Sequence, residues 1–259
     1  MKKQKNKLAL VTGASRKIGI GAAIALELAR DGIEVFLTYY RPYDHETGLA
    51  GKPDEPRNLV EEIRRMGRKA ESLEIDLASK EAPKKLFDYV EETFGTVSIL
   101  VNNATYSMRD GIENITAEQL DKHYKVNIRA MALLCAEFVK RYKKHMPGNR
   151  NGRIINLSSG QSIEPMPEEL AYAATKGAVE AFTVSLSAEV GRLGITVNAV
   201  DPGITDTGWI SAEMKDKWSA DSPMGRVGEP EDAARLIRFL ASDDASWITG
   251  QVIHSRGGL

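Results

Sequence analysis

Tyr172 and Lys176 lie four positions apart, and Ser159 lies thirteen residues before the tyrosine. On a helix, positions i and i+4 share one face, so the Lys176 ammonium would lie beside the Tyr172 phenol. A free phenol has a pKa near ~10, and an adjacent cation in a cleft of low dielectric lowers that pKa. The spacing indicates a tyrosine that donates a proton near neutral pH to an oxygen bound by Ser159. A solvated helix face also contains such a Tyr-x-x-x-Lys pair by chance.

The composition is typical of an ordinary soluble protein. The chain has 259 residues, of which 42% are hydrophobic and 27% are charged, and its formal net charge is -1. This length suits one large α/β core. The chain has neither the basic excess expected of nucleic-acid binding nor the roughly 18 consecutive apolar residues of a membrane span. We therefore expect neither nucleic acid nor membrane as a partner.

Two features bear on the compartment. The single cysteine, Cys135, excludes an internal disulfide and lies in an apolar run, so we expect a small core residue, as free cysteines commonly are. The start of the chain, Met1 to Lys7, is basic, but the apolar run Leu8 to Val11 that follows is far shorter than the core of a signal peptide. We expect that run to be a strand and the protein to be cytoplasmic.

Short apolar runs alternate with helical patterns along the chain, which is typical of βα units and a parallel sheet. We expect strands at 8–12, 34–39, 69–75, 99–102, 153–157, 196–200 and 252–254. We expect helices at 21–31, 56–66, 79–94, 116–142, 172–193 and 230–240. The fold class is α/β, a single domain over residues 1–259 with a Rossmann-like doubly wound parallel sheet of about seven strands.

Two segments interrupt this alternation. Residues 40–56 contain three prolines and two glycines with little periodicity, and they form a longer connection than βα loops usually have. We expect a surface excursion there. Residues 203–228 contain Trp209 and Trp218. Long segments of this kind in compact domains are often lids, so we expect a substrate lid.

A glycine-rich loop, Thr12 to Gly21, follows the first strand and opens into a helix. Glycines allow the backbone to turn tightly and to approach a pyrophosphate, and the helix N-terminus supplies free N–H groups. The loop predicts a dinucleotide site. A glycine-rich turn that merely connects a strand to a helix is the alternative.

The charges near this loop favour NADP(H) over NAD(H). NAD sites commonly place an acid about twenty residues beyond the glycines, but the second strand ends without one. The cations Arg16, Lys17 and Arg41 lie instead where a 2'-phosphate would bind, and arginine suits bidentate phosphate binding. Ordinary solvated charges are the alternative.

The motifs together resemble the short-chain dehydrogenase/reductase family over essentially the whole chain. The resemblance implies that Asp76 binds the adenine ring, that Asn102-Asn103-Ala104 shapes the cofactor groove, and that Pro202-Gly203 with Thr207 binds the nicotinamide carboxamide. The cofactor-binding residues that we expect are Gly13, Ser15, Arg16, Lys17, Gly19, Ile20, Arg41, Asp76, Leu77, Asn103, Ala104, Tyr172, Lys176, Pro202, Gly203, Thr205 and Thr207.

Local runs such as Ile195-Thr196-Val197-Asn198-Ala199-Val200 look most like bacterial 3-oxoacyl-acyl-carrier-protein reductases. Two departures stand out. Thr105 replaces a glycine that usually follows the Asn-Asn-Ala motif, and the phosphate loop has two extra residues when Gly19-Ile20-Gly21 is aligned with the family's Gly-Ile-Gly. An ungapped alignment would instead put Lys17 where the middle glycine belongs, so the phosphate contacts of Arg16 and Lys17 stay open. The 40–56 segment also lies beside the adenosine side of the predicted site, where it can reshape a 2'-phosphate pocket.

The resemblance implies an NADPH-dependent enzyme that reduces a ketone, such as a 3-oxoacyl thioester. Its catalytic residues would be Ser159, Tyr172, Lys176 and Asn127, with Lys176 lowering the Tyr172 pKa and holding ribose hydroxyls while Asn127 positions a water. The alternatives are a dehydrogenase of sugars, polyols or other secondary alcohols, and a cofactor-binding regulator without turnover.

Two expectations concern metals and assembly. None of the four histidines, His45, His123, His145 and His254, has metal-ligand spacing, so we expect no metal. Members of the resembled family are commonly tetramers built through two long helices, which implies a homotetramer or homodimer here.

Overall fold

A computed structural model describes residues 7–49 and 51–258 of the chain. Within them, seven parallel strands form one sheet in the order β3-β2-β1-β4-β5-β6-β7. The strands are β1 (Leu8–Val11), β2 (Glu34–Tyr39), β3 (Ala70–Glu74), β4 (Ile99–Asn102), β5 (Gly152–Leu157), β6 (Ile195–Asp201) and β7 (Val252–His254). The predicted doubly wound sheet is confirmed, and each expected strand is present within two residues of its predicted bounds.

The strand order reverses between β1 and β4. From β1 the chain builds outward through β2 to β3, and it then returns to place β4 on the other side of β1. Ligands of open α/β sheets bind at the carboxyl ends of the strands beside such a reversal. The loops that follow β1 and β4 are therefore the structural centre of any site.

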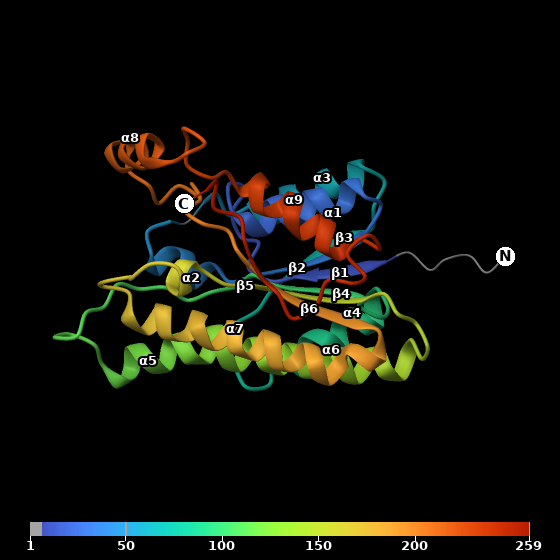
Figure 1. Ribbon diagram of the computed structural model, residues 1–259. Helices are drawn as coiled ribbons and strands as arrows, with labels where there is room; N and C mark the ends of the chain where they lie inside the picture. The colour runs from blue at the N-terminus through green and yellow to red at the C-terminus, as the bar shows by residue number, and fades with distance from the viewer. Residues whose placement is uncertain (1–6, 50, 259) are drawn as a thin grey trace.

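Helices cover both faces of the sheet (Figure 1). One layer contains α1 (Ile20–Arg30), α3 (Glu55–Arg65) and α9 (Pro230–Ala241), and the other contains α4 (Ala82–Thr93), α6 (Met131–His145) and α7 (Leu170–Val190). Side chains alternate across β1, so Ala9 and Val11 pack under the first layer and Leu8 and Leu10 under the second. Two apolar cores result, one on each side.

The long helix expected at 116–142 is interrupted. It begins as α5 (Ala117–His123), passes through a π-helix, Tyr124–Ala130, and continues as α6. A capping box begins α5: Thr116 Oγ1 accepts a hydrogen bond from the Gln119 N–H at 3.2 Å, and the Thr116 N–H donates to Gln119 Oε1 at 2.9 Å. Single π-helical turns inside α-helices often mark functional sites, and this one contains Asn127.

The excursion at 40–56 is more ordered than its sequence suggested. It contains α2 (Arg41–Glu46), with Pro42 in the first helical turn, a position that proline tolerates. The interpretation as a surface excursion is corrected at Asp44, which is buried. Within this segment, Ala50 lies outside the described residues.

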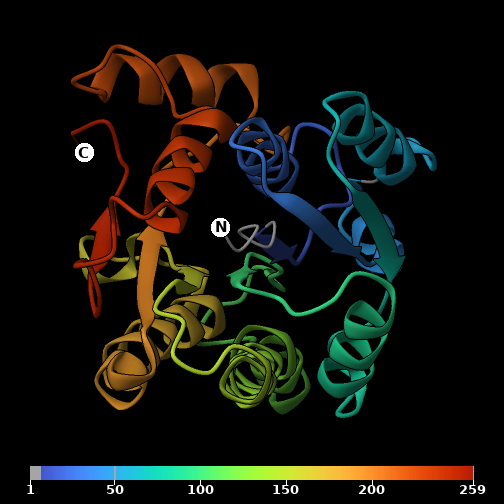
Figure 2. The ribbon, with the colours of Figure 1, turned by 90° about the vertical axis from the view of Figure 1, so that its right-hand side faces the viewer.

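The expected lid segment contains one helix, α8 (Ala212–Asp221). None of the residues of α8, all of which the structure describes, is buried, and the helix stands apart from the sheet and its two layers (Figures 1 and 2). The segment is anchored at its base, where the Gly228 N–H donates to Ile204 O and the Asp206 N–H donates to Gly228 O, both at 2.9 Å.

The basic start of the chain, Met1 to Asn6, and the last residue, Leu259, lie outside the described residues. Among the helices that the structure does describe, none combines the length and the apolar character needed to cross a membrane.

The core packing predicts a large effect from one aromatic truncation. Phe138 is 1% exposed and stacks on Tyr142 with ring centroids 5.6 Å apart. Phe138→Ala should lower the free energy of unfolding by about 3–5 kcal/mol, because it removes buried surface and leaves a cavity. Urea unfolding measures the loss. Phe239→Ala is the control, since Phe239 is 42% exposed and should lose far less; equal losses would contradict this packing.

Candidate active site

Tyr172 and Lys176 lie in the first two turns of α7, next to the end of β5. The Lys176 ammonium donates a hydrogen bond to the Leu157 carbonyl at 2.8 Å and lies 5.4 Å from the centroid of the Tyr172 ring. Ser159 follows β5, and its hydroxyl lies close enough to the Tyr172 phenol to affect the pKa of that phenol. The structure therefore brings together the three side chains whose spacing suggested an acid, its activator and an oxygen-binding hydroxyl.

The electrostatics of this cluster differ from the sequence expectation. Burial raises the pKa of the Tyr172 phenol above its ordinary value; the Ser159 side chain opposes the rise, and the Glu169 carboxylate adds to it. Burial also lowers the pKa of Lys176 to about 8. The lowered phenol pKa that we expected from Lys176 is thus not found, because burial dominates and the ammonium is hydrogen-bonded to a carbonyl.

Asn127, in the π-helix, is buried and hydrogen-bonds to two other segments of the chain. Its side-chain oxygen accepts from the Tyr106 N–H at 2.7 Å, and its amide nitrogen donates to Tyr106 O and to Thr175 Oγ1, each at 2.9 Å. These bonds join the loop after β4 to α7 one residue before Lys176. The arrangement makes Asn127 a positioning residue for the loop and the catalytic helix.

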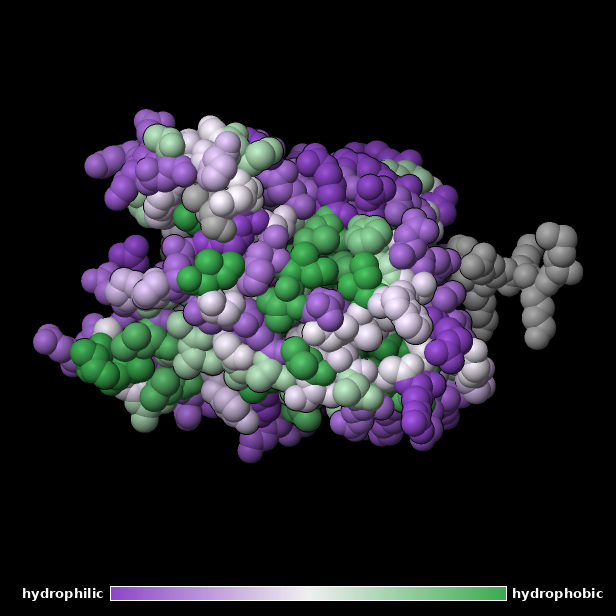
Figure 3. Space-filling view, in the orientation of Figure 1, coloured by the Kyte–Doolittle hydropathy of each residue, from purple (hydrophilic) through white to green (hydrophobic). Residues whose placement is uncertain are grey.

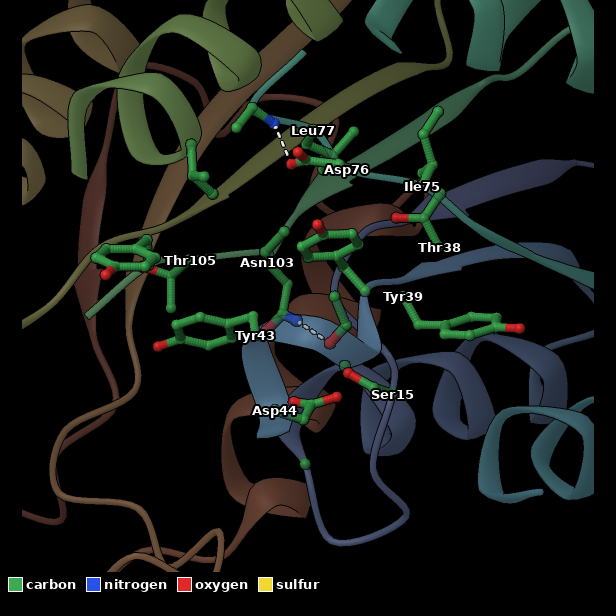
Figure 4. Close-up of a pocket in the computed structure, with 18 of the residues that line it drawn as sticks. Ser15, Thr38, Tyr39, Tyr43, Asp44, Ile75, Asp76, Leu77, Asn103 and Thr105 are labelled. Atoms are coloured by element: carbon green, nitrogen blue, oxygen red, sulfur yellow. Dashed lines mark hydrogen bonds between the residues drawn. The ribbon is translucent and has the colours of Figure 1, made fainter. Parts of the chain in front are cut away.

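A pocket of about 420 Å³ opens beside the phosphate loop. Ten of the expected cofactor-binding residues line it: Gly13, Ser15, Arg16, Gly19, Ile20, Asp76, Leu77, Asn103, Ala104 and Thr207. They come from four separate loops, and Figure 4 shows Ser15, Asp76, Leu77 and Asn103 around the same space. The Asp76 carboxylate accepts from the Ala78 N–H at 2.8 Å.

The floor of the pocket requires glycine. Gly13 has φ +75, and a Cβ there would lie 2.7 Å from Ala104 Cα. A Cβ on Gly21 would lie 2.5 Å from Gly13 O. The Asn103 side-chain amide links the loop after β4 to the phosphate loop, because it donates to Thr12 O at 2.8 Å and to Gly13 O at 2.9 Å. The backbone can therefore approach a pyrophosphate closely, as a dinucleotide requires, and the residues present fit such a cofactor.

The extra residues of the phosphate loop form a tight turn, in which the Gly19 N–H donates to Arg16 O at 3.0 Å. The turn exposes Lys17, while the Arg16 guanidinium crosses the pocket and donates to Thr207 O at 2.8 Å. Arg16 and Lys17, whose phosphate contacts the sequence left open, therefore differ in their position relative to the pocket. Arg16 faces the pocket and Lys17 does not line it.

Arg41 is directed elsewhere. Its guanidinium donates to the carbonyls of Lys52 at 3.2 Å and Gly51 at 3.4 Å, and the residue is not among those that line the pocket. The short helix α2 causes this placement, because it turns the chain at the end of β2. Arg41 is therefore bonded within its own segment, and its contact with a 2'-phosphate stays a prediction.

Pro202, Gly203 and Thr205 lie at the base of the lid segment and also do not line the pocket. Gly203 has φ +66, and a Cβ there would lie 2.9 Å from Arg256 Cα. The Arg256 guanidinium hydrogen-bonds to buried Asp201, which also contacts His254. Arg256 and His254 thus pack against the start of the 203–228 segment.

Tyr43, Asp44 and Tyr106 also line the pocket, and sequence reasoning missed all three. The Tyr43 and Tyr106 rings lie 5.3 Å apart. Tyr43 and Asp44 belong to the segment expected to be a surface excursion, and a helical pattern of six residues is too short to detect. The run of tyrosines around Arg41 was the available signal.

Cys135 is buried, as expected, and accepts a hydrogen bond from the Asn102 amide at 3.4 Å. His123 is also buried, with its ring nitrogens bonded to Gln119 O and to the Met108 N–H. Over residues 7–49 and 51–258, no group of three His, Cys, Asp or Glu side chains is arranged to hold a metal ion.

The glycine at position 13 provides a test of the dinucleotide site. Gly13→Ala should abolish binding of NADPH and NADH in a calorimetric titration, because its Cβ would collide with backbone at Ala104. Gly67→Ala is the matched control: Gly67 has φ +77, but a methyl group added there would meet nothing within 4 Å. It should cost only about 1 kcal/mol of stability and leave binding intact. Binding by the Gly13 variant at normal affinity would contradict the site.

Comparison with known proteins agrees with this geometry. Residues 13–259 match the family model described as "Enoyl-(Acyl carrier protein) reductase". An uncharacterized oxidoreductase of Bacillus subtilis is 48% identical over 258 residues, covering 100% of this chain and 98% of the relative. A 3-oxoacyl-[acyl-carrier-protein] reductase of Staphylococcus epidermidis is 36% identical, covering 98% of this chain and 99% of the relative.

Solved structures give the same result. A promiscuous reductase that catalyses keto-reduction at C1 in lugdunomycin biosynthesis aligns with a TM-score of 0.82 and 39% identity over 97% of this chain and 96% of the other. A short-chain dehydrogenase/reductase from Serratia marcescens gives 0.85 and 30%, covering 97% of each chain. A metagenomic blue fluorescent protein in complex with NADPH gives 0.84 and 30%, again covering 97% of each chain. The chain belongs to the short-chain dehydrogenase/reductase family of oxidoreductases, which bind NAD(P).

Proposed function

We propose that this oxidoreductase uses NADPH to reduce a ketone to a secondary alcohol and that a 3-oxoacyl thioester is one candidate substrate. The observation that carries the proposal is the cluster of Ser159, Tyr172 and Lys176 at the carboxyl end of β5. A phenol, a hydroxyl and a buried ammonium in one place suit the protonation of an oxygen that gains charge. The relatives described as keto-reducing enzymes support the same reaction class.

In the proposed mechanism, the bound cofactor supplies a hydride to the carbonyl carbon. Ser159 holds the carbonyl oxygen by a hydrogen bond, and the Tyr172 O–H gives its proton to that oxygen. General acid catalysis of this kind is worth roughly 10²- to 10⁴-fold. The raised pKa keeps the phenol protonated until the oxygen becomes basic. The Lys176 ammonium, 5.4 Å from the ring, then stabilises the phenolate.

The preference for NADPH is supported by Arg16, which lines the pocket, and by the absence of an acid at the end of β2 in the sequence. A 30% identical structure contains NADPH. A dehydrogenase of sugars, polyols or other secondary alcohols would use the same residues in reverse. NADPH oxidation with an acetoacetyl thioester, compared with a panel of simple ketones and with NADP-dependent oxidation of polyols, separates these functions. Cofactor binding without turnover would favour a regulator.

We also propose that residues 203–228 form a lid that selects the substrate. Two tryptophans anchor its outer part: the rings of Trp209 and Trp218 lie 5.6 Å apart, and Trp209 Nε1 donates to Thr205 O at 3.0 Å. The exposed side chain of Ile18, from the phosphate loop, lies against Gly208. Movement of this segment would therefore displace the Ile18 side chain and disturb the phosphate loop.

A homotetramer or homodimer is the proposed assembly. Strand β7 is the last strand of the sheet, and Val252 and Ile253 in it are partly exposed. Apolar side chains gather across the middle of the face that Figure 3 shows, between the helices above the sheet and α7. On α7, Val184 is 50% exposed. These surfaces support association through the sheet edge and α7.

The proposed role of Tyr172 predicts the effect of removing its phenol oxygen. Tyr172→Phe should lower kcat/KM for ketone reduction by about 10²- to 10⁴-fold, because the general acid is lost, while the affinity for NADPH should stay within about twofold. Tyr89→Phe is the control, since Tyr89 hydrogen-bonds to Glu71 on the surface. Retained turnover in the Tyr172 variant would rule out its assignment as the acid.

The pKa of Lys176 predicts the pH dependence of reduction. Burial lowers that pKa to about 8, so the ammonium is mainly protonated at pH ~7 and loses its proton as the pH rises through about 8. The kcat/KM for reduction should therefore fall on the alkaline side with an apparent pKa near 8. Initial rates measured between pH ~6 and ~10 at constant ionic strength check this, and a flat profile over that range would refute it.

A further inference from the structure

The short helix α2 places an acid against the phosphate loop. Asp44 is 5% exposed and lines the pocket. The Ser15 side chain lies close enough to the carboxylate to oppose the rise in its pKa, and Arg16 Nε lies 3.9 Å from Oδ1. Among the described residues, Oδ2 has no hydrogen-bond partner. Figure 4 shows Asp44 and Ser15 on the same side of the pocket. A buried carboxylate with one unsatisfied oxygen thus faces the cofactor site.

Other contacts hold α2 in this position. The Tyr43 hydroxyl donates to Ser107 O at 3.2 Å and accepts from the Ser107 N–H at 3.0 Å. Arg41, at the start of the helix, is bonded to the carbonyls of Gly51 and Lys52. Contacts from α2 therefore reach both the phosphate loop and the loop after β4, which line the same pocket.

Arg16 is also the cation that supports NADPH in the proposed function, and Ser15 is an expected cofactor-binding residue that lines the same pocket. A phosphate and the Asp44 carboxylate would compete for the same donors. Two anions about 4 Å apart repel strongly where the dielectric is low, and burial already raises the pKa of Asp44. The site cannot hold both anions without further positive charge.

We propose that Asp44 is an internal competitor for a phosphate of the dinucleotide, occupying the Ser15 and Arg16 donors until the cofactor displaces it. The inference rests on the proposed function, because it takes NADP(H) as the ligand. It makes Asp44 a residue that sets cofactor affinity and, if the 2'-phosphate is the competing group, the preference between NADPH and NADH.

Glu46, two residues further along the chain, provides the contrast. Its carboxylate hydrogen-bonds to the Tyr106 hydroxyl at 3.3 Å and lies 3.7 Å from the Lys122 ammonium. Its side chain is 44% exposed, so solvent and Lys122 compensate its charge. Removing the charge of Glu46 changes the net charge of α2 equally but does not release the phosphate loop.

The test is calorimetric titration of wild type, Asp44→Asn and Glu46→Gln with NADPH and with NADH at fixed ionic strength. Asp44→Asn should bind NADPH about tenfold more tightly, and Glu46→Gln should stay within about twofold of wild type. A gain for NADPH alone assigns the 2'-phosphate as the competing group, and an equal gain for NADH assigns the pyrophosphate. Unchanged or weaker NADPH binding by Asp44→Asn would overturn the inference.

The titration distinguishes failure of the proposed function from failure of the Asp44 inference. If wild type and Asp44→Asn both bind neither dinucleotide, the proposed function fails and this inference fails with it. If wild type binds NADPH but Asp44→Asn gains nothing, only the inference fails.

Should Asp44→Asn not fold, hydrogen exchange of the wild type replaces the titration. Amides of residues 41–48 should exchange faster when NADPH is added, since α2 loses its contact with Ser15 and Arg16, while amides of the phosphate loop become slower. Slower or unchanged exchange in 41–48 on NADPH binding would overturn the inference.

Discussion

The hydrogen bonds between the end of β1 and the loop after β4 hold the two halves of the site in register. Thr12 Oγ1 accepts from the Asn103 and Ala104 N–H groups, each at 3.0 Å, and the Asn103 side chain donates back to the carbonyls of Thr12 and Gly13. This junction lies where the strand order reverses. Because Gly13 approaches the backbone of Ala104 so closely, the junction tolerates no side chain at residue 13.

The same loop continues to the catalytic helix. Thr105 and Tyr106 bond to Asn127, and Asn127 bonds to Thr175, which precedes Lys176. Buried and partly buried hydrogen bonds therefore link the phosphate loop, through the loop after β4, to α7, where Thr175 Oγ1 donates to the carbonyl of Tyr172, the proposed acid. Since a displacement of about 1 Å between reacting groups costs roughly 100-fold in rate, these bonds explain how separate loops achieve one geometry.

The sequence predicted the sheet and the grouping of Ser159, Tyr172 and Lys176 better than it predicted the loops. Strands buried on both faces are apolar runs, and Tyr172, Lys176 and Ser159 are set by local spacing, so both could be inferred from one chain. The π-helix around Asn127 could not, because α and π turns share the same apolar pattern. The positions of the Arg16, Lys17 and Arg41 side chains could not be predicted either. They depend on a tight turn and on α2, and tertiary contacts determine both.

Burial explains why the pKa values of the groups near the site differ from those that the sequence suggested. The sequence suggested a cation that lowers a phenol pKa, but desolvation raises the phenol pKa and lowers that of Lys176 to about 8. Likewise, the sequence suggested a surface position for Asp44, which lies buried beside Ser15. Perturbed titratable groups cluster at functional sites. Here Asp44 lines the pocket beside the phosphate loop, and the Lys176 ammonium lies beside Tyr172 at the end of β5.

Transfer of deuterium from NADPH that carries deuterium in both positions of the hydride-donating carbon of the nicotinamide tests the central claim most directly. Mass spectrometry of the alcohol formed from an acetoacetyl thioester or a reactive simple ketone should show one deuterium on the carbinol carbon with the wild-type protein, and labelled alcohol should form about 10²- to 10⁴-fold more slowly with Tyr172→Phe. NADPH oxidation without deuterium in the product, or equal rates of labelling by both proteins, would contradict carbonyl reduction with Tyr172 as the acid.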